Sequence, residues 1–313
     1  MIISGDLELD FIWSKTTSCF EWEEGPGIAN KPSIYLVENH WEEYSFWTPL
    51  EEKPYLFIEF AELKPDDNIF LEWANENGRL THGKLLDFYA MFGEDGNKFL
   101  DEVGSDSWRL PVEKRTLWHE AHTELSRTYK IWKLLEDENK DVLGQYFGWE
   151  RNEQNIPVEF VYYFSGKDSL KKRRKTPKTT LDRLLARQGM KKIISDTDTH
   201  WQKYRMFYPD IKTPARFYVE SVIFAMINRY PVNLSLSFDE KTGAVKQKLR
   251  PSSLLSAMWL MFHLYIKGDI RIKRCEVCGK WENMEGHRAN WTRHKSCGNN
   301  ARVQEYRKKN IKK

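Results

Sequence analysis

The sequence predicts an α+β protein that is mostly helical, with short β-strands in its N-terminal half and a small separate module at its C-terminus. Three observations support this prediction. The first forty residues alternate apolar and polar side chains, later segments repeat apolar residues at helical spacing, and the last forty residues hold two close pairs of cysteine and histidine. The chain has 313 residues, of which 40% are hydrophobic and 14% aromatic, so it can form a sizeable core.

Strands are predicted where apolar and polar residues alternate, or where turn residues separate two such runs. Within the first forty residues the alternation runs from Leu7 to Trp13 and returns at Ile34, and Gly25-Pro26-Gly27 interrupts it. Later strands are predicted at Val158 to Phe164, and as a hairpin from Asn233 to Leu249 around Lys241-Thr242-Gly243.

Helices are predicted where a capping residue precedes an apolar stripe and glycine ends it. Asp66 and Asp67 precede a stripe that stops at Gly78, and Pro251-Ser252-Ser253 starts an apolar run that stops at Gly268. The second run is too short to cross a bilayer and is predicted to be a core helix. The other predicted helices are Leu85 to Phe92, a long helix from Pro111 to Gly144, one capped by Thr180 and one opened by Thr213-Pro214.

The two halves of the chain carry opposite charge. Residues 1–160 contain 15 Lys and Arg against 33 Asp and Glu, whereas residues 161–313 contain 34 against 13. A basic half is typical of a protein that binds a polyanion such as nucleic acid. Attraction between two parts of one fold would explain the same asymmetry. The most basic segment, Lys167 to Lys178, is predicted to be an exposed loop that either contacts phosphate or is simply solvated.

Composition and charge together predict four segments. We expect an acidic α+β domain over residues 1–165, a basic loop over 166–179, a helical region over 180–270 that packs on the first domain, and a C-terminal module over 271–313. No apolar run is long enough for a membrane span, and the first nine residues lack the features of a secretory leader. The sequence therefore predicts a cytoplasmic protein with reduced cysteines and no membrane partner.

The C-terminal module holds two ligand pairs for a metal. Cys275 and Cys278 form a C-x2-C pair, and His294 and Cys297 form an H-x2-C pair fifteen residues further on. Two such pairs at this separation are typical of a closed, tetrahedral structural zinc site, which leaves no position for a catalytic water. His287 is an alternative to His294 as the third ligand, and His294 is favoured because it has the paired spacing.

The surroundings of these ligands predict a treble-clef-like zinc finger. The segment Arg274 to Trp281 has the form of a zinc knuckle, which is a tight turn at the end of a hairpin, and a basic helix is predicted after Cys297. Residues 271–313 contain 13 basic and four acidic side chains. We expect the following basic side chains to contact the phosphates of nucleic acid, with DNA as the expected partner: Arg293, Lys295, Arg302, Arg307, Lys308 and Lys309.

The module also resembles the CGNR zinc-finger family. The resemblance rests on Arg274-Cys275-x2-Cys278-Gly279 and on Ser296-Cys297-Gly298-Asn299-Asn300-Ala301-Arg302-Val303, with Ser253 to Trp259 resembling the segment that leads into the finger. It implies a zinc finger behind a larger N-terminal α+β domain, in a transcription regulator of the bacterial stress-induced type. Asn300 stands at the position of the family's signature arginine, and His294 replaces its third cysteine.

Two other functions are consistent with the sequence. In one, the finger is a purely structural clamp in a protein-interaction module. The sensor role, in which the N-terminal domain binds a small molecule or a protein, belongs to the nucleic-acid-binding function described above. A metal-dependent hydrolase would use His119 and His122, or Asp196, Asp198 and His200. The two histidines are three residues apart and not four, as zincins require, so an exposed polar helix face explains them better. The aspartates are better explained as a turn and helix cap. The sequence therefore predicts no catalytic residues, and it does not indicate an oligomeric state.

Overall fold

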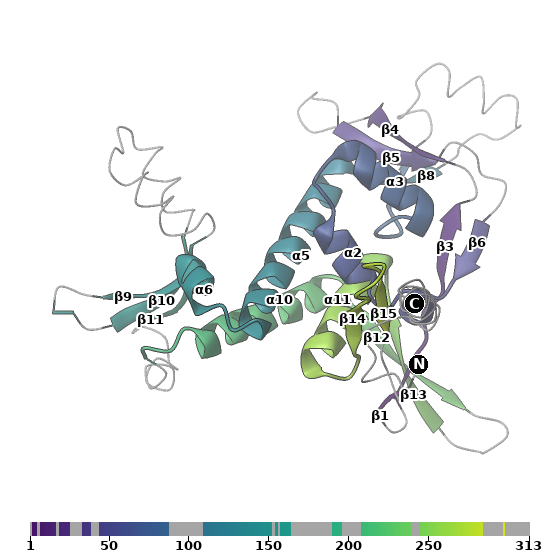
Figure 1. Cartoon of the computed structure of the whole chain (residues 1–313). Coiled ribbons are helices and arrows are strands. Elements are labelled where there is room, and N and C mark those ends of the chain that lie inside the picture. The colour runs from purple at the N-terminus through teal and green to yellow at the C-terminus, as the bar shows by residue number, and fades with distance from the viewer. Residues whose placement is uncertain are drawn as a thin grey trace, which may run out of the picture. The chain divides into compact units, whose positions relative to one another are not determined.

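The computed structural model describes residues 2–4, 7–16, 19–25, 33–38, 44–87, 109–151, 154–155, 157–163, 190–195, 208–238, 245–283 and 297. These residues form seven α-helices and fifteen β-strands, so the predicted α+β class is confirmed (Figure 1). The chain divides into two compact units, one of Met1–Ser126 with Ala225–Lys313 and one of Arg127–Phe224. Both boundaries fall inside long helices, α5 (Arg115–Glu136) and α10 (Lys212–Arg229).

The first unit contains most of the strands, in small sheets. One four-stranded sheet has the order β1-β2-β13-β12 and another has the order β4-β5-β8-β7, while β3 pairs with β6 and β14 with β15. Their bounds are β1 (Ile2–Ser4), β2 (Leu7–Leu9), β3 (Trp13–Thr16), β4 (Phe20–Gly25), β5 (Ser33–Glu38), β6 (Tyr44–Trp47), β7 (Lys84–Asp87), β8 (Arg109–Lys114), β12 (Val232–Phe238), β13 (Val245–Pro251), β14 (Ile272–Arg274) and β15 (Trp281–Asn283). The predicted hairpin from Asn233 to Leu249 is confirmed as β12 and β13.

Two helices of the first unit, α3 and α11, begin and end at the residues that the sequence indicates. The Asp66 side chain accepts hydrogen bonds from the amides of Asn68 and Ile69 and so caps α3 (Asp67–Asn77), which Gly78 ends with a φ of +94°. Ser253 caps α11 (Leu254–Lys267) in the same way, and Gly268 ends that helix in the left-handed conformation. Two shorter helices, α1 (Pro49–Glu52) and α2 (Leu56–Glu62), precede α3.

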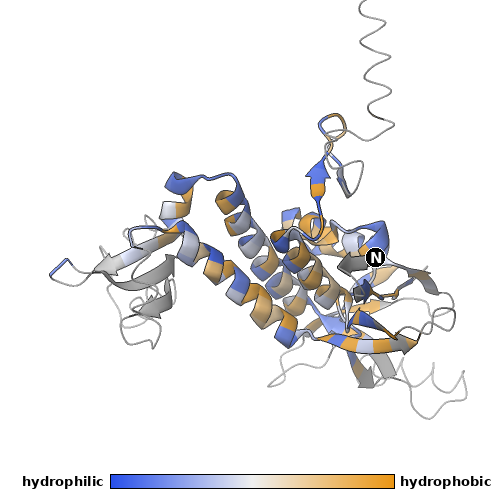
Figure 2. Cartoon of the chain, turned by 90° about the horizontal axis from the view of Figure 1, so that it is seen from below, coloured by the Kyte–Doolittle hydropathy of each residue, from blue (hydrophilic) through white to orange (hydrophobic). Residues whose placement is uncertain are grey.

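Aromatic side chains from four helices form the core of the first unit. The rings of Phe57 in α2 and Phe262 in α11 stack at 5.1 Å, and the rings of Phe60 and Trp73 lie 4.9 Å apart. Trp118 of α5 completes the cluster, 5.7 Å from Trp73. Hydrophobic and hydrophilic segments alternate along the helices in Figure 2, as expected for helices that bury one side. No helix in the described part of the chain is both long and apolar enough to cross a membrane.

The second unit contains the three-stranded antiparallel sheet β11-β10-β9, together with α6 (Lys140–Tyr146) and the adjoining parts of α5 and α10. Its strands are β9 (Phe147–Arg151), β10 (Pro157–Tyr163) and β11 (Met190–Ser195). The predicted strand at Val158 to Phe164 is confirmed as β10, and the helix predicted from Thr213-Pro214 is confirmed as α10. The Phe147 and Tyr218 rings pack edge to face at 5.6 Å in this unit.

Two predicted helices differ from the structure. Pro111 does not open the long helix, because it lies in β8 opposite Leu85 of β7, and α5 begins four residues later. At that point β8 pairs only with β7, so the missing proline N–H costs no hydrogen bond to β5. The same pairing makes residues 85–87 a strand, where a helix was predicted; residues 88–92 lie outside the described part. The long helix also ends at Glu136, before α6 begins at Lys140.

Several predictions concern residues that the structure does not describe. These are the basic loop Lys167 to Lys178, the helix capped by Thr180 and the basic helix after Cys297.

Candidate metal centre

The first ligand pair lies in the turn of a small hairpin, as the knuckle prediction requires. Strands β14 and β15 pair in antiparallel register, with Ile272 opposite Asn283 and Arg274 opposite Trp281. Ile272 is buried and anchors the hairpin, so the turn that carries both cysteines projects from a fixed base. Cys275 directly follows β14 and Cys278 comes three residues later.

Backbone hydrogen bonds close this turn. The Cys275 amide donates to the carbonyl of Lys280 at 2.8 Å, and the Gly279 amide donates to the carbonyl of Cys275 at 2.8 Å. Gly279 has a φ of +72°, a conformation that glycine adopts at no steric cost. This position therefore explains why glycine follows the second cysteine.

Arg274 holds the turn from outside, a role that the sequence analysis missed. Its Nε donates to the Gly279 carbonyl at 2.7 Å, and its guanidinium lies over the Trp281 ring, 5.7 Å from the centroid. The only sequence signal for this role was an arginine directly before the first cysteine. The hairpin register places Trp281 directly opposite that arginine. The guanidinium of Arg274 is thus part of the support of the turn that carries Cys275 and Cys278.

Three thiols converge at this turn. The sulfur atoms of Cys275, Cys278 and Cys297 all lie within 4.8 Å of one another, and none of them forms a disulfide. Cys275 is buried, Cys278 is exposed and Cys297 is half-buried. In a tetrahedral site with Zn–S bonds of about 2.3 Å, sulfur atoms lie roughly 3.8 Å apart. The donor set therefore fits one divalent ion after small side-chain adjustments, and the three cysteines can hold a metal.

The surroundings of the Cys297 sulfur favour its neutral thiol form. Desolvation raises the pKa of the Cys297 thiol, and the neighbouring thiols of Cys278 and Cys275 raise it further. A divalent ion reverses this situation, because it binds thiolates and releases their protons. Metal binding at this cluster is therefore expected to depend on pH.

The remaining predicted residues of the module lie outside the described part of the chain. These are His294, the alternative ligand His287 and the six basic residues from Arg293 to Lys309. Within the described part, four basic side chains of the hairpin region are exposed: Arg271, Lys273, Arg274 and Lys280.

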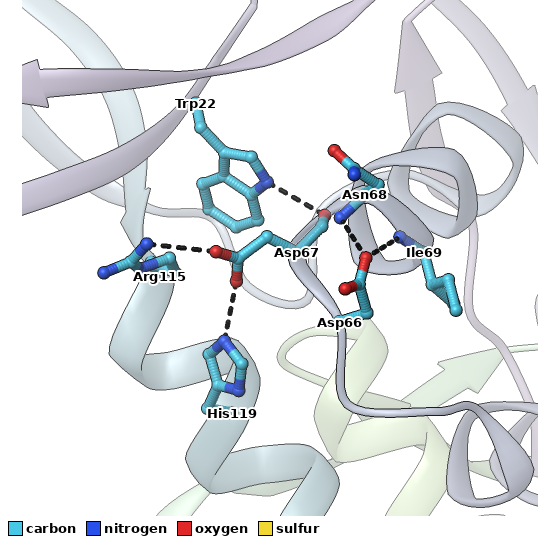
Figure 3. Close-up of polar contacts among 7 residues, drawn as sticks. All are labelled: Trp22, Asp66, Asp67, Asn68, Ile69, Arg115 and His119. Carbon is cyan, nitrogen blue, oxygen red and sulfur yellow. Dashed lines mark hydrogen bonds and ion pairs between the residues drawn. The ribbon is translucent and has the colours of Figure 1, made fainter.

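The histidine pair of α5 has structural partners and does not converge on one point. His119 Nε2 lies 2.7 Å from Asp67 Oδ1, and His122 Nε2 lies 2.9 Å from the Leu63 carbonyl, to which it donates. Asp67 also accepts a hydrogen bond from Arg115 Nη1 at 3.0 Å, so its carboxylate joins the start of α3 to α5 (Figure 3). His122 is buried, not exposed as predicted, while His119 is half-exposed.

A search for other metal sites finds none elsewhere in the described residues. There, Cys275, Cys278 and Cys297 are the only group of three or more histidines, cysteines or carboxylates whose ligand atoms lie close enough to share an ion. Asp196, Asp198 and His200 lie outside the described residues.

Two cavities of the first unit flank its helices. One of about 560 Å³ lies beside the β14–β15 hairpin and is lined by Lys280 and Trp281 together with carboxylates that include Glu51, Glu59 and Glu76. Burial raises the pKa of Glu59, an effect that Lys53 and Lys280 oppose. The other cavity, of about 380 Å³, is lined by residues of α5, α10 and α11 that include His119, Glu120, Glu124, Arg229 and Tyr230.

No family model, curated protein or solved structure matches this chain. The function is therefore argued from the geometry and chemistry of these sites.

Proposed function

We propose that this chain is a cytoplasmic zinc-finger protein that binds nucleic acid and regulates transcription, with its N-terminal region acting as a sensor or interaction domain. The observation that carries the proposal is the convergence of three thiols within 4.8 Å on a hairpin whose surrounding basic side chains are exposed. The resemblance of this module to CGNR zinc fingers supports the same function.

Zinc is the metal that suits this donor set best. Three thiolates are soft ligands, and neutral imidazole is a common fourth ligand of a Cys3His zinc site. In the proposal His294 supplies that imidazole. A site with four protein ligands has no open position, so its zinc is structural, and reduced thiols of this kind persist in the cytoplasm.

The charge of the module is the reason to expect nucleic acid as the partner. Four exposed basic residues lie on the described hairpin, and the six predicted contacts from Arg293 to Lys309 extend the positive surface. Each phosphate that such side chains neutralise releases condensed counterions, so binding must weaken as salt rises. Contacts of this kind position a protein on DNA without selecting a sequence.

A fluorescence-anisotropy titration with labelled duplex DNA and RNA at several salt concentrations tests this function. The proposal predicts a slope of log affinity against log salt of about −0.9 for each phosphate contacted on DNA. Changing the six basic residues to Gln should flatten that slope and lower the affinity by at least roughly tenfold at low salt. A control with one charge fewer changes the five basic residues Lys171 to Lys175 to Gln. Its effect should be much smaller, because the proposal places the phosphate contacts on the C-terminal module. Absence of salt-dependent binding in the unaltered chain would refute the proposal.

One structural observation favours a second candidate, a protein-interaction module with a purely structural zinc. Lys280 and Trp281 of the hairpin line the same cavity as carboxylates of α1, α2 and α3, so the finger faces an acidic surface of its own unit. In this case the zinc only fixes the hairpin against that surface. The six-residue neutralisation would then leave the function intact, whereas loss of Cys275 would still disorder the module.

The cavity of about 380 Å³ is the proposed sensor site, since it has the size of a small-molecule pocket and combines Arg229 with the carboxylates of Glu120 and Glu124. Opposite charges in one cavity suit a zwitterion such as a free amino acid. A thermal-shift screen with the amino acids, run on the unaltered chain and on Arg229→Ala, tests this assignment. Stabilisation that the substitution abolishes would support it, and no stabilisation by any amino acid would reject it.

A further inference from the structure

The outer face of strand β12 exposes a row of large apolar side chains. Leu234, Leu236 and Phe238 are 61%, 68% and 66% exposed, and Val245, directly opposite Phe238 on β13, is 59% exposed. Residues two apart on a strand point to the same face, so these four side chains form one continuous patch at the free end of the hairpin. Soluble monomers rarely expose a contiguous apolar patch of this kind without a partner for it.

Among the described residues, nothing pairs with the outer edge of strand β12. It is the last strand in the order β1-β2-β13-β12, and its seven residues pair with β13 without a bulge. Proteins usually guard such an edge with charged residues, prolines or bulges. The edge strands β4, β7, β9 and β11 all contain charged residues. Strand β12, with the sequence Val-Asn-Leu-Ser-Leu-Ser-Phe, contains none and is the longest edge strand in the described part of the chain.

The residue pattern of β12 is complementary to itself. In an antiparallel pair of two β12 strands with the twofold axis at Ser235, Leu234 lies opposite Leu236 and Val232 lies opposite Phe238. In the same register the polar residue Asn233 lies opposite Ser237. Apolar residues therefore meet apolar residues on one face, and small polar residues meet on the other. A two-residue shift in register would place an end of the apolar row beyond its partner, so the central register is preferred.

Charge supports a second copy over a charged partner. Two cations of β13 on the polar face are already paired within their own sheet, because Lys248 lies 3.9 Å from Glu8, and Arg250 donates to Asp10 at 2.6 Å. Strand β12 separates them from the free edge. In a pair of β12 strands, the two β13 strands lie three strand spacings apart, about 14 Å, which exceeds the screening length in physiological salt. Like charges therefore do not oppose the pairing.

In this pairing the apolar rows of the two strands lie side by side. Leu234 of one copy lies next to Leu236 of the other, and Val232 lies next to Phe238, so neighbouring apolar side chains cover part of each other's surface. Val245 belongs to β13 and lies one strand away from the seam.

We propose that two copies of this chain form a homodimer in which their β12 strands pair antiparallel about Ser235, so that the two four-stranded sheets become one eight-stranded sheet. This inference goes beyond the proposed function and depends on neither zinc nor nucleic acid.

Sedimentation velocity across the micromolar range tests the association. The unaltered chain should sediment at twice the mass of one chain, and Leu236→Lys should reduce the mass to that of the monomer, because the substitution places a charge in the centre of the apolar row. Leu85→Lys is the matched control, since Leu85 is also an exposed leucine on an edge strand, at 57%. It should remain dimeric. A monomeric unaltered chain, or equal effects of both substitutions, would overturn the proposal.

Cysteine cross-linking tests the register. The twofold axis places the two Ser235 residues directly opposite each other, with Cα atoms about 4.5–5.5 Å apart, which is within disulfide range. Ser235→Cys should therefore form a covalent dimer under mild oxidation. Asn233→Cys, two residues away, should not, because its two copies would lie about 14 Å apart. Both variants are made in a Cys19→Ser background to remove the exposed thiol outside the metal cluster. A dimer that Leu236→Lys dissociates but Ser235→Cys does not trap would contradict the edge pairing.

Discussion

Arg274 and Gly279 are joined across the base of the metal-binding turn, with Arg274 Nε 2.7 Å from the Gly279 carbonyl oxygen. The same guanidinium covers Trp281, so a single side chain connects the turn to the second strand of the hairpin. Gly279 in turn donates its amide to the carbonyl of Cys275. The conformation that aims Cys275 and Cys278 at one point thus depends on a residue that binds no metal.

Replacing Arg274 should therefore weaken metal binding without removing a ligand. Arg274→Lys keeps the charge but loses the Nε hydrogen bond and the planar stacking on Trp281. We expect zinc affinity to fall roughly 10–100-fold, which is the usual cost of losing an outer partner of a metal site. Competition with a chromophoric chelator measures it. Arg271→Lys, at another exposed basic residue near the hairpin, is the control, and an equal loss there would contradict a positioning role.

Cysteine substitutions should separate the metal ligands from the remaining cysteine. Cys275→Ser removes a buried ligand, and we expect it to lose bound zinc and the order of the C-terminal module. Cys19→Ser changes an exposed thiol outside the cluster and should retain one zinc per chain. Elemental analysis gives the stoichiometry. Retention of zinc in Cys275→Ser would show that the metal is held elsewhere.

The cluster of three cysteines could be predicted from residue spacing, but the contacts of Arg274 that hold its turn could not. C-x2-C spacing places two sulfur atoms on one turn by local geometry alone. Cys297 belongs to the second ligand pair, and in a zinc site built from two such pairs both pairs bind the same ion, so Cys297 was expected to lie near the first pair. The contact of Arg274 with Trp281 depends on hairpin register, which the ligand spacing does not specify. The roles of His119 and His122 were also out of reach, because their partners Asp67 and Leu63 lie more than fifty residues away in sequence.

Buried His122 should make stability fall at mildly acidic pH. Desolvation lowers the pKa of His122 below the ordinary value of histidine, and the nearby His119 lowers it further, although the hydrogen bond to Leu63 acts in the opposite direction. The folded chain then binds fewer protons than the unfolded chain, so the free energy of unfolding decreases as pH falls below about 6.5. His122→Gln keeps an N–H donor for Leu63 and removes the titration. Urea unfolding at pH 7.5 and 5.5 should show a smaller decrease for His122→Gln, and an equal decrease would contradict this assignment.

Substitution of Glu113 should lower the free energy of unfolding more than substitution of most other residues. Its buried carboxylate accepts hydrogen bonds from the Leu80 amide at 3.0 Å, from the Thr81 hydroxyl and amide, and from Trp118 Nε1 at 3.1 Å. Glu113→Ala leaves these donors without an acceptor and should cost about 3 kcal/mol or more of unfolding free energy. Glu120→Ala, an exposed carboxylate on α5, should cost about 0.5 kcal/mol or less. Similar losses in chemical denaturation would contradict the role of Glu113.

The burial of the Glu113 carboxyl is one feature of the fold that could not be predicted from the sequence. Its pKa is raised, because burial outweighs the hydrogen bonds that lower it, and nothing in the local sequence indicates a buried acid. Helices α3 and α11 could be predicted because Asp66, Gly78, Ser253 and Gly268 mark their ends within a few residues. Strand β7 could not, since residues 84–87 pair with a partner about 25 residues away, and that pairing overrides the local helical pattern.

X-ray absorption at the zinc edge of the purified full-length chain tests the central claim most directly. The account predicts one zinc with about three sulfur neighbours at about 2.3 Å and one nitrogen neighbour at about 2.0–2.1 Å. A protein without zinc, or a zinc surrounded only by oxygen and nitrogen, would contradict it.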